Sequence, residues 1–152
     1  MRKKDKVAVI HGPNINLTGT RETELYGVLP LEDINNGLKI RAGKSADLTF
    51  FQSNCEGEIV TFIQSCFGFD GIIINAAGYT HTSVAIRDAL LAVSVPYVEV
   101  HISNIFAREK FRHRSYLSGK AAGVVCGLKE YSYYAALDFF LKVDQKRVAD
   151  FS

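Results

Sequence analysis

The strongest constraint on the fold is a repeated alternation of short apolar segments with helical patterns. The apolar segments are VAVIH at 7–11, LTFFQ at 48–52, GIIIN at 71–75, PYVEVH at 96–101 and GVVCG at 123–127. They are apolar almost throughout rather than alternating, which is typical of strands that helices cover on both faces. Because parallel strands need helical crossovers, the alternation predicts an α/β fold with a five-stranded parallel sheet.

Between these segments, apolar residues recur at helical spacing. They mark helices at Leu31, Ile34, Leu38 and Ala42; at Ile59, Ile63, Cys66 and Phe67; at Ile86, Ala89, Leu90 and Val93; and, from about Tyr131, at Tyr133, Leu137, Phe140 and Leu141. Ser53 and Glu56 predict a capping box at the start of the second helix. The simplest arrangement is a flavodoxin-like three-layer sandwich with strand order 2-1-3-4-5. No repeat or linker interrupts the pattern, so we expect residues 1–152 to form a single flavodoxin-like catalytic domain.

Composition excludes several classes of function. The formal net charge is only +2, which does not predict nucleic-acid binding, and no apolar stretch approaches the roughly 18 residues that a membrane span requires. The three cysteines form no C-x-x-C pair, so neither a disulfide framework nor a zinc site is expected. With no signal-peptide pattern at the start of the chain, the expected location is cytoplasmic.

The predicted topology indicates where a ligand would bind. In such sheets the site lies beyond the carboxyl ends of the strands, here near the first and third strands, where the strand order reverses. The segments at that edge are His11 to Gly27, Asn75 to Ser83, and Glu99 to Asn104 continuing toward Arg108 and Arg112. The last two residues are four apart, which predicts that they share one helical face.

These segments lack the patterns of several common sites. There is no glycine-rich dinucleotide or phosphate loop after the first strand, no acidic cluster, no recognisable metal-ligand spacing and no nucleophile elbow. What remains is proton transfer by histidine and tyrosine, with amides and arginines to hold an oxygen-rich anion. Each residue taken alone has a structural interpretation: Asn14 as a turn former, Tyr26 as a packing residue, His101 as a buried group oriented by Glu99, and His81 as a helix cap.

Four segments carry a resemblance to a known family. GPNINLTGTRETELYG, QSNCEGE, NAAGYTHTSVAIRDAL and EVHISNIFAREKFRHRS resemble, in order and spacing, the signature segments of type II 3-dehydroquinate dehydratases. The resemblance implies a flavodoxin-like enzyme that converts 3-dehydroquinate to 3-dehydroshikimate through an enolate, with neither metal nor cofactor. It implies a role in the shikimate pathway or in quinate breakdown. It also implies a homo-oligomer, a dodecamer built from trimers.

The same resemblance implies roles for particular catalytic residues. Tyr26 would be the general base, and Arg21, on a lid, would help to hold it as phenolate. His101 would be the general acid, positioned by Glu99, and Asn14 would hold a water that stabilises the enolate.

Further residues would bind the substrate. Asn75 and the backbone amides of Ile102 and Ser103 would receive the carboxylate or neighbouring oxygens, and His81 and Arg112 would contact ring hydroxyls. The resemblance also implies that Asp88 reaches into the active site of an adjacent subunit. Asp88 lies off the apolar stripe of its own helix, which fits an outward role but equally fits a solvated aspartate.

The chain also departs from the family pattern. Ala76 and Thr23 stand where proline is common, His11 stands where relatives often carry asparagine, and GLKEYSYYAAL matches the glycine-rich family ending poorly. We expect turnover to be the property most sensitive to Thr23, because a flexible residue loosens a lid. Two other functions use the same residues: a non-catalytic binding module for a polyhydroxylated carboxylic acid, and another cofactor-free lyase or isomerase.

Overall fold

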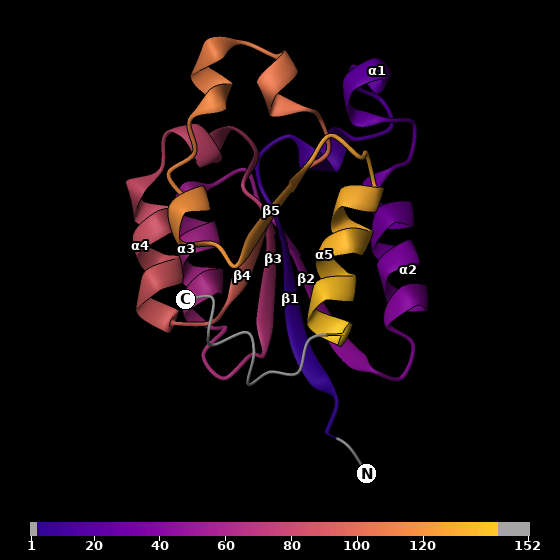
Figure 1. The fold of residues 1–152 in the computed structure, drawn as a ribbon, viewed down its shortest axis with the longest axis vertical. Coiled ribbons are helices and arrows are strands. Elements are labelled where there is room, and N and C mark those ends of the chain that lie inside the picture. Colours follow the sequence, from indigo (N-terminus) through magenta and orange to yellow (C-terminus); the bar gives the residue numbers. More distant parts are fainter. Residues whose placement is uncertain (1–2, 143–152) are drawn as a thin grey trace.

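A parallel sheet between two layers of helices forms the centre of the molecule (Figure 1). The computed structural model describes residues 3–142. Its strands are β1 (Asp5–His11), β2 (Ala46–Gln52), β3 (Gly71–Asn75), β4 (Tyr97–His101) and β5 (Gly123–Cys126). They lie in the order β2-β1-β3-β4-β5, and each neighbouring pair is parallel. The predicted fold class and strand order are therefore confirmed.

Two pairs of helices cover the sheet. On one face lie α2 (Leu31–Ala42) and α5 (Tyr131–Lys142), and on the other lie α3 (Glu56–Gln64) and α4 (Val84–Val93) (Figure 1). Each pair packs on its own hydrophobic core, one built on Ile34, Leu38 and Leu137 and the other on Ile59, Ile63 and Leu90. Every residue of β3 and β4 is buried, which explains why these segments are so apolar.

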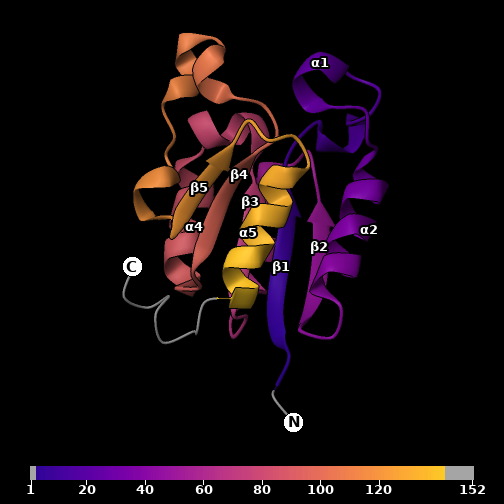
Figure 2. The ribbon, with the colours of Figure 1, turned by 45° about the vertical axis from the view of Figure 1, so that its right-hand side comes forward.

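Short helices lie above the carboxyl ends of the strands (Figure 2). They are η1 (Ile15–Leu17), α1 (Thr23–Tyr26), η2 (Ala77–His81), η3 (Ile105–Ala107), η4 (Lys110–His113) and, beside β5, η5 (Ser118–Lys120). None of the long helices within residues 3–142 has the length and apolar character needed to cross a membrane. The predicted domain, 1–152, extends beyond the described residues at both ends.

The start and end of α3 differ from the prediction. The capping box is wrong: Cys55 is the N-cap residue, and Ser53 Oγ instead accepts a hydrogen bond from the Cys55 N–H at 2.9 Å. The Ser53 hydroxyl donates to Glu58, two residues beyond the predicted partner Glu56. Phe67 was expected on the buried face, but α3 ends at Gln64 and Phe67 is 65% exposed. A local sequence pattern located this helix but not its ends.

The loops after β1 and β3 touch each other directly. A Cβ atom on Gly12 would lie 2.5 Å from the carbonyl oxygen of Ala76, so only glycine fits at this position. Two residues later, Asn14 adopts a left-handed conformation with φ of 68°, which asparagine tolerates better than most residues. These two features fix the loops at the point where the strand order reverses.

His11, the last residue of β1, is a fully buried polar side chain. Its Nδ1 lies 2.9 Å from the Tyr133 hydroxyl, and its Nε2 lies 2.9 Å from Asn35 Oδ1. Burial disfavours the charged imidazole and lowers the pKa of His11 from 6.5 to about 4, although the Asn35 hydrogen bond opposes this shift. His11 is therefore neutral in the folded protein near neutral pH.

This burial predicts a pH dependence of stability. Between its ordinary pKa and its pKa in the folded protein, His11 is protonated in the unfolded chain but not in the folded one. The free energy of unfolding therefore decreases as the pH is lowered. When the pH is lowered from about 7.5 to about 4.5, His11 should decrease the free energy of unfolding by about 2–3 kcal/mol. Urea unfolding measured across this pH range should show that the free energy of unfolding decreases less in His11→Asn than in wild type. His113→Asn, at an exposed histidine, is the control and should behave as wild type. Equal slopes for wild type and His11→Asn would contradict the prediction.

Candidate active site

A pocket opens at the carboxyl ends of β1, β3 and β4, where the topology predicted it. Its cavity volume is about 130 Å³. Its lining includes most of the predicted site residues: Asn14, Arg21, Tyr26, Asn75, His81, His101, Ile102, Ser103 and Arg112. Pro13, Ile15, Ala77, Gly78, Ile105 and Arg108 complete the lining.

Two predicted residues do not line this pocket. Glu99 lies behind His101, and Asp88 is exposed on α4. The assignment of Asp88 to a neighbouring subunit's site stays a prediction.

Two arginines lie close to the ring of Tyr26. The Arg21 guanidinium carbon is 4.1 Å from the centroid of the Tyr26 ring, and that of Arg108 is 5.3 Å away. Tyr26 itself is only 9% exposed. The positive charges of two guanidinium groups therefore lie close to a nearly buried phenol ring.

Arg108 is the residue that the prediction of the site omitted. The prediction that Arg108 and Arg112 share one helical face is wrong, because Arg108 has extended backbone at the end of η3 and Arg112 lies in the separate η4. Both still line the pocket. The signal for Arg108 was its position after β4, on a segment already expected at the site.

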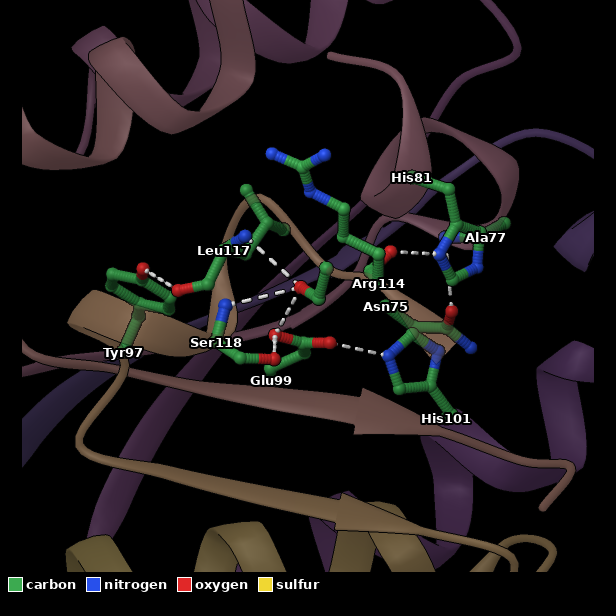
Figure 3. Close-up of polar contacts among 10 residues, drawn as sticks. Asn75, Ala77, His81, Tyr97, Glu99, His101, Arg114, Leu117 and Ser118 are labelled. Carbon is green, nitrogen blue, oxygen red and sulfur yellow. Dashed lines mark hydrogen bonds and ion pairs between the residues drawn. The ribbon is translucent and has the colours of Figure 1, made fainter. Parts of the chain in front are cut away.

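His101 is held by a buried carboxylate (Figure 3). Its Nε2 is 2.6 Å from Glu99 Oε1, while the other carboxylate oxygen accepts hydrogen bonds from the hydroxyls of Ser115, at 2.9 Å, and Ser118, at 2.7 Å. Burial alone raises the pKa of Glu99, but the hydrogen bond from His101 and the two serine hydroxyls outweigh burial, and the net pKa is lowered. Glu99 is therefore an anion that accepts a hydrogen bond from His101 Nε2 and fixes the ring.

His81 lies beside His101, with the two rings stacked at 17° and their centroids 6.2 Å apart (Figure 3). Its Nδ1 is 2.7 Å from the backbone oxygen of Arg114, which only accepts, so Nδ1 carries the proton. Partial burial, reinforced by the nearby His101 and Arg112, lowers the pKa of His81 although the Arg114 carbonyl raises it. A neutral His81 presents Nε2 as an acceptor. The predicted capping role falls instead to Ser83, whose Oγ accepts from the Ile86 N–H at 2.9 Å.

The charges around the pocket suit an anion. Three guanidinium groups line it, and no Asp or Glu is among the lining residues of the described chain. Arg108 Nη1 donates to Ser103 Oγ at 3.1 Å, and Arg112 Nε donates to Glu109 at 2.7 Å. Within residues 3–142, no three His, Cys, Asp or Glu side chains are grouped so that they could hold a metal ion. The groups that the pocket offers are a phenol beside cations, a carboxylate-backed imidazole and several hydrogen-bond donors.

Comparison with known proteins identifies the family of the chain. Residues 5–141 match the family model described as dehydroquinase class II. A 3-dehydroquinate dehydratase of Prochlorococcus marinus (strain NATL1A) is 57% identical over 132 residues, covering 86% of this chain and 91% of the relative. One of Acinetobacter baylyi is 55% identical over 139 residues, covering 90% of this chain and 93% of the relative.

The structural comparison agrees with the sequence comparison. The crystal structure of a type II dehydroquinase from Butyrivibrio crossotus superimposes with a TM-score of 0.88 at 41% identity, covering 90% of this chain and 97% of that chain. Both the sequence and the fold match over nearly the whole length. The chain therefore belongs to the class II dehydroquinase family, a family of hydro-lyases.

Proposed function

We propose that this protein dehydrates 3-dehydroquinate to 3-dehydroshikimate by anti elimination through an enolate, in the shikimate pathway or in quinate breakdown. One observation carries the proposal. A tyrosine close to two guanidinium groups and a histidine backed by a buried carboxylate line the same pocket, in which the described residues place no carboxylate. The names of the relatives specify the reaction for which such a base and acid would serve.

The first step is removal of a proton beside the ketone. Such a proton is only weakly acidic, so its removal needs a base present in its deprotonated form and donors for the enolate oxygen. Tyr26 is the base, and Arg21 and Arg108 stabilise its phenolate. Asn14 holds a water that donates to the enolate oxygen. The C–H electrons pass into the enolate, and the proton passes to Tyr26.

The second step is loss of the hydroxyl group. Hydroxide is a poor leaving group, so His101 donates a proton as the C–O bond breaks and water departs. Glu99 keeps the His101 ring oriented through the hydrogen bond to Nε2. After the two steps Tyr26 holds one extra proton and His101 lacks one, and exchange with solvent restores both.

The remaining predicted residues bind the substrate. Asn75 and the backbone amides of Ile102 and Ser103 receive the carboxylate and neighbouring oxygens, while His81 and Arg112 contact ring hydroxyls. We further propose a single catalytic domain over residues 1–152, a cytoplasmic location, and a dodecamer built from trimers in which Asp88 reaches a neighbouring site. Neither metal nor cofactor takes part in this scheme.

The direct test is to give purified protein 3-dehydroquinate and follow the ultraviolet absorbance of the conjugated enone. The signal should appear without added metal and should persist in the presence of a chelator. A folded protein that gives no enone but binds 3-dehydroquinate in calorimetry would be a binding module, and the proposal would be wrong. Loss of the signal on chelation would overturn the metal-free mechanism.

The proposed base can be tested by substitution. Tyr26→Phe removes the phenol oxygen and should lower kcat by about 10²- to 10⁴-fold, while calorimetry still detects substrate binding. Arg21→Ala should lower kcat by orders of magnitude, and Arg21→Lys, which keeps the charge, should lower it less. Tyr131→Phe makes the same chemical change on an exposed residue outside the pocket and should be neutral. Near-native turnover in Tyr26→Phe would refute the assigned base.

The proposed acid predicts a change in the pH–rate profile. A general acid works only while protonated, so kcat should fall with rising pH as His101 loses its proton. His101→Ala should remove this limb together with most of the activity. Glu99→Gln should also lower kcat, because the amide cannot hold the His101 ring as the carboxylate does. If the limb stays in place in His101→Ala, another group donates the proton.

A further inference from the structure

A chain of buried polar groups leads from the pocket into the interior. Asn75 Nδ2 is 3.0 Å from the Tyr133 hydroxyl, which lies 2.9 Å from His11 Nδ1. His11 Nε2 in turn lies 2.9 Å from Asn35 Oδ1. Asn75, Tyr133 and His11 are almost wholly buried, and of these four residues only Asn75 lines the pocket. This hydrogen-bonded chain connects β3, α5, β1 and α2, so it depends on the packing of four elements that are distant in sequence.

The direction of every hydrogen bond in the chain follows from one backbone group. The Ala77 N–H can only donate, and it lies 3.1 Å from Asn75 Oδ1 (Figure 3), which identifies the oxygen end of the amide. Asn75 Nδ2 therefore donates to Tyr133, whose hydroxyl proton must then go to His11 Nδ1. The His11 proton is left on Nε2 and is donated to Asn35.

Two further observations agree with this direction. Burial lowers the pKa of His11 to about 4, so near neutral pH its ring is neutral and Nδ1 can accept. Ala77 adopts a left-handed conformation with φ of 51°, which is unfavourable for a residue other than glycine. A local strain that is kept in the folded state beside a pocket suggests a functional arrangement of the backbone.

These hydrogen bonds leave the Asn75 side chain with one N–H donor that is available to a ligand. Its Oδ1 accepts from Ala77, and one of its two Nδ2 hydrogens is used by Tyr133. The second Nδ2 hydrogen is the donor that remains. An amide free to rotate could instead turn its oxygen toward the pocket, where that oxygen would repel an anion.

We propose that Tyr133 and His11 are positioning residues that hold the Asn75 amide so that it presents only an N–H donor to an oxygen of the substrate. This inference rests on the proposed function, in which Asn75 receives the carboxylate or neighbouring oxygens. Neither Tyr133 nor His11 touches the substrate. Their effect passes through Asn75 alone, so it concerns binding more than the proton transfers at Tyr26 and His101.

Tyr133→Phe is the first test, because it removes the hydroxyl and keeps the ring. KM should rise by about five- to tenfold, as expected for a lost donor in binding, and kcat should stay within about twofold of wild type. Tyr134→Phe is the matched control: it removes a hydroxyl from the next residue of the same helix and should leave KM unchanged. An unchanged KM in Tyr133→Phe, or a loss confined to kcat, would overturn the proposal.

Variants at His11 supply a second test if Tyr133→Phe does not fold. Asparagine can place an oxygen near the position of Nδ1 and accept from Tyr133, whereas leucine cannot. His11→Asn should therefore keep KM near the wild-type value, and His11→Leu should raise it as Tyr133→Phe does. Similar KM values for the two His11 variants would show that the acceptor at this position does not matter.

The side-chain amide resonances of Asn75 give a readout that does not depend on activity. In ¹⁵N-labelled protein without ligand, Tyr133→Phe and His11→Leu should shift the two Nδ2 proton signals, and Tyr134→Phe should not. In wild type, adding 3-dehydroquinate should shift one of these signals. If wild type makes no enone, the proposed function fails. If wild type is active but neither variant moves the Asn75 signals or KM, the positioning role alone fails.

Discussion

The parallel pairing of β1 with β3 is the interaction on which the active site depends. Their register places His11 beside Asn75, the last residue of each strand, and the two loops that follow meet where Gly12 packs against Ala76. Because parallel strands end at the same edge, functional groups far apart in sequence reach one pocket. The close approach at Gly12 leaves no room for a side chain, so the separation of the two loops is set by the backbone itself.

The fold buries two polar networks at this edge, and each holds one pocket side chain. Glu99, with its serine partners, fixes His101 from the side of β4, and the Tyr133–His11 chain fixes Asn75 from the side of α5. Burying such groups is unfavourable unless every donor and acceptor is satisfied. A satisfied network has few alternative arrangements, and this rigidity keeps the groups that it holds in one orientation.

The sequence allowed much of this structure to be predicted, and the failures share a cause. Strand order and pocket position follow from hydrophobic pattern and from a topological rule, so they needed no side-chain detail. The start of α3 and the shared face of Arg108 and Arg112 were wrong, because short-range spacing does not show where a helix begins or breaks. The contact of His11 with Tyr133 joins residues 122 apart, and no local pattern indicates such a pair. The resemblance to a family supplied the site residues that physical reasoning alone left open.

The pocket arginines are held by ion pairs at the surface. Arg21 is paired with Glu22 at 2.8 Å and Arg112 with Glu109 at 2.7 Å, and both glutamates are more than half exposed. Ion pairs of this kind contribute little net free energy, because water and salt screen the charges. Neither glutamate lines the pocket, so the pairing leaves the lining itself without a carboxylate.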